Sequence, residues 1–158
     1  MSLPVAIRTS AHSRLAALVL CAILLAAAPA RGDGATGSPS TQNLDYQMGM
    51  EAIQASDWNR AIHDLNVASV AEPTNADLQN WLGFAYRQEG SYTAAFEHFR
   101  AALHLDPAHR RAHEYIGENY LLTGNKAKAK EHLAALLRIC GKTCEEYQVL
   151  QKTIATAK

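Results

Sequence analysis

The sequence predicts an all-α fold of three tandem antiparallel helix pairs, followed by one capping helix. The first observation is that Gly49, Gly83 and Gly117 are evenly spaced along the chain. The second is that other residues recur in the same register. These are Ala61, Ala95 and Ala129, and Leu65, Phe99 and Leu133. A fixed period of about 34 residues is typical of stacked supersecondary units, which bury a continuous core only between neighbouring units.

Residues 1–30 have the pattern of a secretory signal peptide. Two early arginines precede an apolar run over residues 15–28, and an Ala-Pro-Ala motif ends at Ala30. The run is shorter than the roughly 20 residues that span a bilayer as a helix. We therefore expect cleavage near Ala30 and a periplasmic or secreted protein with no membrane span after cleavage. The alternative is an uncleaved membrane anchor.

Residues 31–41 are rich in Gly, Ser and Thr and have no apolar periodicity, which predicts a disordered leader. Three repeats are expected to follow, at residues 42–75, 76–109 and 110–141. In the middle repeat, Gly90 and Ser91 separate two amphipathic segments, and Ser91 is the expected N-cap of the second helix. Asp106-Pro107 ends that helix, because the residue before a proline is disfavoured in the helical region. The corresponding breaks in the other repeats are Ser56-Asp57 and Gly124-Asn125.

The three periodic glycines fall in helix interiors, where glycine costs about 1 kcal/mol relative to alanine. Such a cost in every unit predicts close approach between the two helices of a pair, which a side chain would block. The expected small partners across this contact are Ala61, Ala95 and Ala129.

These recurring residues resemble the tetratricopeptide repeat family over residues 42–141. The motif residues are Leu82-Gly83, Tyr86, Ala95, Phe99, Ala102 and Pro107 in the middle unit, and Ile116-Gly117, Tyr120, Ala129, Leu133 and Leu136 in the third. The first unit matches at fewer positions, and Ala52 replaces the expected tyrosine. The resemblance implies a right-handed α-solenoid of helix pairs.

The resemblance also implies where a partner binds, because the first helix of each pair lines the concave groove in this family. The positions that correspond are Tyr46, Met50, Ile53, Asn80, Phe84, Arg87, Arg111, Glu114, Glu118 and Leu121. An amphipathic helix or an extended segment would suit such a groove. Family members that clamp a partner's terminal carboxylate use a lysine and asparagines there. In this chain Tyr46, Met50 and Trp81 replace them and only Arg111 matches, which disfavours that subclass.

Residues 142–158 are expected to form the capping helix, with Thr143 as N-cap and Glu146 completing a capping box. Cys140 and Cys144 remain after signal removal, and in an exported protein such a pair usually forms a disulfide. The alternatives are a thiol redox couple, reduced thiols and metal-bound thiols.

The composition and motifs predict a protein that is not an enzyme and holds no cofactor or metal. No nucleophile–base arrangement is recognisable. The 15 basic and 15 acidic side chains balance, so nothing indicates nucleic-acid binding. His109 and His113 have a spacing that could hold a metal, but no other ligand pattern completes a site, and we interpret them as surface histidines.

The functional hypothesis is an exported adaptor that binds a peptide or helix of another protein in the groove of the repeats. One alternative is a structural subunit of an envelope complex that self-associates through an open end of the stack. The other is a metal- or thiol-redox-active periplasmic protein.

Overall fold

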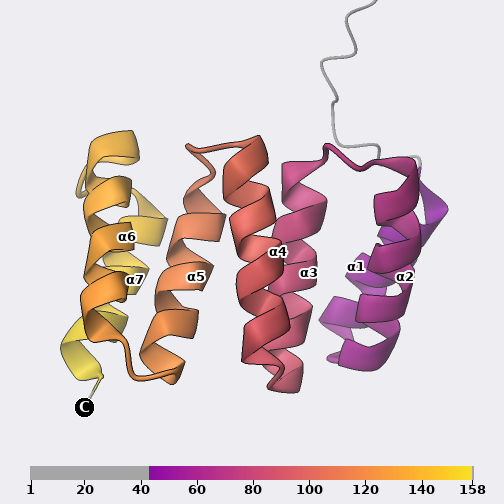
Figure 1. Ribbon diagram of the computed structural model, residues 1–158, viewed down its shortest axis with the longest axis horizontal. Helices are drawn as coiled ribbons and strands as arrows, with labels where there is room; N and C mark the ends of the chain where they lie inside the picture. Colours follow the sequence, from indigo (N-terminus) through magenta and orange to yellow (C-terminus); the bar gives the residue numbers. More distant parts are fainter. Residues whose placement is uncertain (1–42, 158) are drawn as a thin grey trace, which may run out of the picture. The chain divides into compact units, whose positions relative to one another are not determined.

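The computed structural model describes residues 43–157, and within them every regular element is an α-helix (Figure 1). The helices are α1 (Leu44–Gln54), α2 (Trp58–Ala71), α3 (Ala76–Glu89), α4 (Tyr92–Leu105), α5 (Arg110–Leu122), α6 (Lys126–Cys140) and α7 (Glu145–Thr156). The expected signal peptide and leader, at residues 1–30 and 31–41, lie outside the described residues. Among the described helices, none is long and apolar enough to cross a membrane.

The helices pack as three pairs in chain order: α1 with α2, α3 with α4, and α5 with α6. Each pair also contacts the next, through α2 with α3 and α4 with α5, and α7 packs on both α5 and α6. Short connections within each pair make its helices antiparallel neighbours (Figure 1). The all-α solenoid of helix pairs is therefore confirmed.

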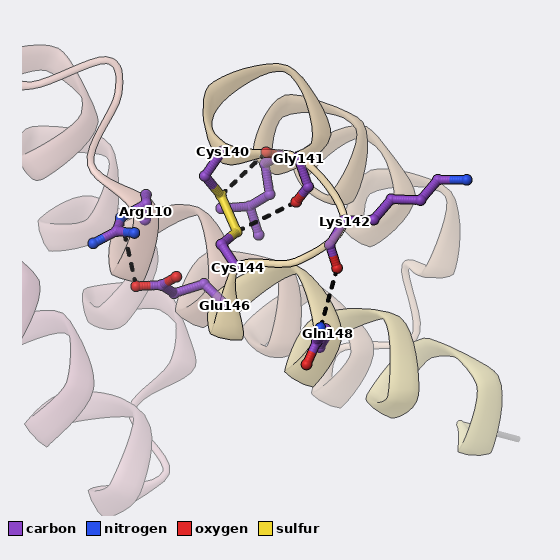
Figure 2. The surroundings of a disulfide bond; sticks show 8 residues. Arg110, Cys140, Gly141, Lys142, Cys144, Glu146 and Gln148 are labelled. Carbon is purple, nitrogen blue, oxygen red and sulfur yellow. Dashed lines mark hydrogen bonds and ion pairs between the residues drawn. A yellow bond between two sulfur atoms is a disulfide. The ribbon is translucent and has the colours of Figure 1, made fainter.

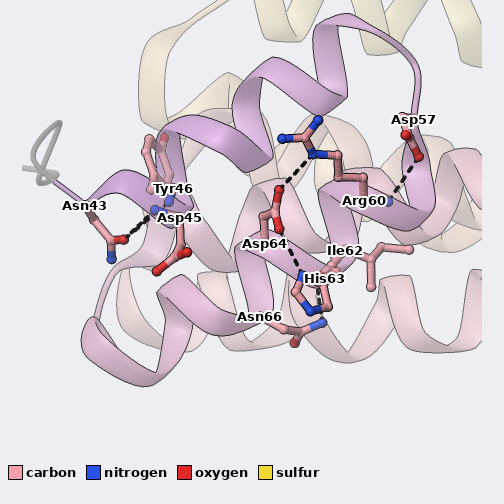
Figure 3. A network of polar contacts seen from close by, with 9 residues as sticks. All are labelled: Asn43, Asp45, Tyr46, Asp57, Arg60, Ile62, His63, Asp64 and Asn66. Atoms are coloured by element: carbon pink, nitrogen blue, oxygen red, sulfur yellow. Dashed lines mark hydrogen bonds and ion pairs between the residues drawn. The ribbon is translucent and has the colours of Figure 1, made fainter.

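Polar residues at the helix starts define where most helices begin. The side chains of Asn43, Asp57, Asn75 and Asn125 accept hydrogen bonds from backbone N–H groups of the first turn (Figure 3 shows the first two). Ser91 occupies the N-cap of α4 but makes no side-chain capping bond, so this part of the prediction is wrong. Gly90, with a φ of 96°, ends α3 in the left-handed region that glycine tolerates.

Each periodic glycine sits against a large side chain rather than an alanine. A Cβ at Gly49 would lie 2.6 Å from Leu65 Cγ, and one at Gly83 would lie 2.6 Å from the Phe99 ring. A Cβ at Gly117 would lie 2.7 Å from Leu150 Cδ2. Close helix approach is therefore present, and the nearest side chain across it is a leucine or a phenylalanine rather than the expected Ala61, Ala95 or Ala129. Those three alanines are fully buried.

The last helix begins one position later than the capping box predicts. Cys144 is the N-cap of α7, in place of Thr143, and it makes no side-chain capping bond. Glu146 instead lies 3.6 Å from Arg110 at the start of α5. Leu150 and Ile154 belong to a buried cluster with Leu136 of α6, so α7 closes the C-terminal end of the core.

Candidate binding surface

The ten positions named for the groove lie on α1, α3 and α5, the first helices of the three pairs, and we call this set the A-helix face. Its members differ in accessibility. Arg111 is exposed, Asn80 and Glu114 are buried, and the other seven are partly buried. The face therefore mixes residues that a partner can touch with residues that hold the helices together.

Aromatic rings form a continuous cluster around Phe84. Its ring centroid lies 5.2 Å from that of Tyr115, 5.8 Å from that of Trp81 and 6.1 Å from that of Trp58. Such edge-to-face and tilted pairs stabilise packing beyond the area they bury. Phe84 thus links α2, α3 and α5, and only part of its ring is available to a ligand.

Arg87 is a structural residue of this cluster. Its guanidinium forms an ion pair with Glu118 across the interface between α3 and α5. It also lies 5.3 Å from the Phe84 ring centroid and 5.0 Å from that of Tyr115. The Arg87 side chain is only 8% exposed, so its charge is already neutralised inside the protein.

Arg111 has the opposite character. It is exposed, its guanidinium lies 5.7 Å from the Trp81 ring centroid, and it has no ion pair with another residue of 43–157. An exposed arginine held over an aromatic face keeps most of its donors free for a carboxylate. Arg111 is therefore the member of the face best placed to meet an anionic group.

Glu114 carries a buried carboxyl group about one helical turn from Arg111. Burial is the main cause that raises its pKa from 4.5 to about 7, and the nearby carboxylates of Glu118 and Glu146 add to the rise, whereas Arg87 and Arg111 oppose it. No hydrogen bond or ion pair joins Glu114 to another described residue. At neutral pH this group is consequently only partly ionised.

Asn80 occupies the same repeat position as Glu114, one unit earlier. It is 1% exposed, and neither Oδ1 nor Nδ2 has a hydrogen-bond partner among the described residues. Buried amides without partners are uncommon, because leaving them unpaired costs stability.

The two ends of the A-helix face contribute mainly to packing. Tyr46 and Ile53 pack on the buried cluster that contains Leu78, and burial raises the pKa of the Tyr46 hydroxyl. Leu121 packs on the C-terminal cluster around Leu150.

The two cysteines lie where α6 meets α7: Cys140 is the last residue of α6, and Cys144 is the N-cap of α7. Their Sγ atoms form a disulfide bond (Figure 2). A carboxylate oxygen of Glu146 lies within 4.8 Å of both sulfur atoms, a set of ligands that fits a metal when the thiols are reduced. In the structure the sulfur atoms are joined and Glu146 faces Arg110.

The sequence matches two family models of the tetratricopeptide repeat, one over residues 46–109 and the other over residues 86–152. The chain belongs to the tetratricopeptide repeat family. No curated protein sequence matches it.

Solved tetratricopeptide repeat structures have the same fold. The first such domain of Spaghetti (RPAP3), bound to the HSP90 peptide SRMEEVD, is 18% identical with a TM-score of 0.66, over 73% of this chain and 93% of that one. SycD of Yersinia enterocolitica, in complex with a peptide of the translocator YopD, is 18% identical with a TM-score of 0.65, over 76% and 91%. The OM64 domain of Arabidopsis is 16% identical with a TM-score of 0.65, over 70% and 91%.

Three residues of the aromatic cluster, Trp58, Trp81 and Tyr115, were missing from the sequence-based set for the tetratricopeptide repeat groove. Trp81 and Tyr115 stand one repeat period apart, and each lies two positions before a periodic glycine. Their rings lie 6.5 Å apart, between α3 and α5. An aromatic residue two positions before the glycine of successive repeats is the sequence signal that could have identified Trp81 and Tyr115.

Proposed function

We propose that this tetratricopeptide repeat protein is an exported adaptor that binds a segment of a partner protein on the A-helix face. The fold supports this, because RPAP3 and SycD have been solved with bound peptides. Their low identity to this chain transfers the fold alone, so the chemistry of the partner is argued from this chain's own residues.

The observation that carries the proposal is the exposed Arg111 stacked on Trp81. A carboxylate of the partner would receive paired hydrogen bonds from this guanidinium. A neighbouring apolar side chain of the partner would cover the accessible parts of Trp81 and Phe84. Because Glu114 is only partly ionised near neutral pH, it offsets only part of the Arg111 charge. The expected ligand is therefore a segment that pairs an acidic residue with an apolar one.

Export is the second element of the proposal and rests on the sequence of residues 1–30. In an oxidising compartment Cys140 and Cys144 would remain bonded, which would join the end of α6 to the start of α7. The proposed activity is binding, in which no covalent bond is made or broken.

Site-specific photocrosslinking in the exported protein tests the surface. A photoreactive amino acid is placed at Met50 on the A-helix face or, as the matched control, at Lys130, an exposed position on α6. Partner adducts are expected from position 50 only, and Arg111→Glu should remove them. Equal adducts from both positions, or adducts insensitive to Arg111→Glu, would contradict the proposed surface.

A second candidate function is self-association, which the exposed valines of the first helix pair favour. Val67 and Val70 lie three positions apart on one side of α2 and are 44% and 83% exposed. Two copies would cover this apolar pair in an assembly. Light scattering across a concentration series tests it, and a monomer at every concentration would exclude it.

A further inference from the structure

His113 of α5 and His132 of α6 face each other within the third helix pair. Their Nδ1 atoms lie 2.9 Å apart, and their ring centroids are 5.2 Å apart with planes tilted by 47°. Both side chains are partly buried, so each remains accessible to solvent in part. A contact between two ring nitrogens requires that one donates a proton and the other accepts it.

The protons can be assigned from the neighbouring groups. The Nε2 atom of His113 lies 3.1 Å from the Pro107 carbonyl oxygen, which can only accept a hydrogen bond. His113 therefore carries its proton on Nε2, and its Nδ1 lone pair points toward His132. A histidine whose second nitrogen donates to a backbone carbonyl is oriented as metal-binding histidines are. The His132 ring is also stacked on Tyr120, at 5.7 Å.

The spacing of the two nitrogens fits a shared metal ion. Metal–nitrogen bonds to histidine are about 2.0–2.1 Å long. Two such bonds at a right angle place the nitrogens about 2.9 Å apart, and right-angled ligands are typical of Cu²⁺ and Ni²⁺. We propose that the Nδ1 atoms of His113 and His132 bind one divalent transition-metal ion of this class, with water completing its coordination.

Binding of the ion neither releases nor takes up a proton. When the ion binds, the proton on His132 Nδ1 moves to Nε2 of the same ring, and each ring turns its Nδ1 lone pair toward the ion. Burial lowers the pKa of His113 and lowers that of His132 to about 4. Both rings are thus neutral ligands around pH 7. The hydrogen bond to the Pro107 carbonyl opposes this lowering of the pKa for His113, and the His113 ring adds to it for His132. Smaller contributions disfavour protonation from His109, Arg138 and Lys128 and favour it from Asp106 and Glu131.

The preceding repeat shows that packing alone does not require two histidines. Gln79 and His98 occupy the corresponding positions, and their Oε1 and Nδ1 atoms lie 2.8 Å apart. His98 stacks on Tyr86 there, at 5.2 Å, as His132 stacks on Tyr120. A glutamine thus satisfies the same contact. His113→Gln should keep the fold while removing one of the two ligands.

Calorimetric titration of the exported, untagged protein with Cu²⁺ at neutral pH tests the site, together with electron paramagnetic resonance of the bound ion. We expect one ion with two imidazole ligands. His113→Gln should weaken binding by about tenfold or more, since even losing an outer-shell partner costs ten- to a hundredfold in affinity. His63→Gln, which alters an exposed histidine on α2, should leave the affinity unchanged. Absent binding, or an equal loss in both variants, would overturn the proposal.

A second metal site introduced into the preceding repeat provides a further test. Gln79→His would place a second histidine opposite His98 in the preceding repeat. Pro73 holds the position there that Pro107 holds in the third repeat. We expect this variant to bind two Cu²⁺ ions per chain. A stoichiometry that stays at one would contradict the geometric argument.

Discussion

The backbone of Gly117 in α5 lies against the side chain of Leu150 in α7, so that a Cβ on Gly117 would come 2.7 Å from Leu150 Cδ2. In the first two repeats the matching glycine meets a residue of its own pair, Leu65 or Phe99. The helix that follows the last repeat has therefore taken over this contact. Docking of α7 depends on the absence of a side chain at Gly117.

Gly117→Ala should consequently destabilise the protein by about 1–3 kcal/mol, the usual cost of overpacking. In a Leu150→Ala background the same change should be neutral or stabilising, because the clash is gone and alanine favours the helix by about 1 kcal/mol. Urea unfolding of the four proteins gives the coupling free energy. An equal cost of Gly117→Ala in both backgrounds would show that Leu150 is not the obstacle.

Gly83→Ala should cost more than Gly117→Ala. The Cβ would meet the Phe99 ring at 2.6 Å at two carbon atoms, and a fully buried ring moves less readily than the end of a leucine. Urea unfolding of both variants side by side measures the difference. The reverse order would indicate that Phe99 can shift inside the core.

The arginines of the A-helix face should separate into a structural and a binding residue. Arg87→Leu should destabilise the fold by about 3 kcal/mol, because it leaves the Glu118 carboxylate without its partner in a mostly buried site. Arg111→Leu should change stability by less than about 0.5 kcal/mol, since Arg111 is exposed. Thermal unfolding distinguishes them. Equal destabilisation would remove the case for Arg111 as a free binding group.

The sequence predicted most of the fold because residues one period apart occupy equivalent positions in successive helix pairs. The evenly spaced glycines located the helix pairs, and Gly90 and Asn125 marked breaks that the structure contains. The contact between Gly117 and Leu150 was not predictable in this way, because Leu150 lies beyond the last repeat and belongs to no period.

The candidate surface was less predictable, for a physical reason. The Arg87–Glu118 pair and the stacking of Arg111 on Trp81 each join neighbouring repeats, and they depend on how closely α3 and α5 approach. A sequence pattern names the residues of a face but not which of them neutralise each other. Ser91 is a similar case, because it has the residue type and place of a cap but makes no capping bond.

Cys140 and Cys144 give a prediction about redox state. The exported protein should show no reactive thiol until a reductant is added, which thiol titration under denaturing conditions measures. Replacing both cysteines with serine should cost about 2 kcal/mol, the chain-entropy value for so short a loop. Two titratable thiols in protein taken directly from the exported fraction would contradict the bonded state.

Glu114 gives a prediction about pH. Its pKa is about 7 in the folded protein and about 4.5 when unfolded, so the folded state favours the protonated form. Its contribution to stability is therefore fully present below about pH 4.5 and is lost as the pH rises to 7 and above. At about 1.4 kcal/mol per pKa unit, the loss is at most about 3 kcal/mol.

Glu114→Gln keeps the shape of the side chain and removes the titration. The variant should match the wild type near pH 4.5 and exceed it in unfolding free energy near pH 8, as measured by urea unfolding at both values. Glu97→Gln, at an exposed position inside α4, is the matched control and should leave the unfolding free energy unchanged at both pH values. Because Glu118 and Glu146 contribute to the raised pKa, neutralising either one should make the wild-type pH dependence shallower. A wild-type stability that does not fall between pH 4.5 and 8 relative to Glu114→Gln would show that the carboxylate finds a partner when it ionises.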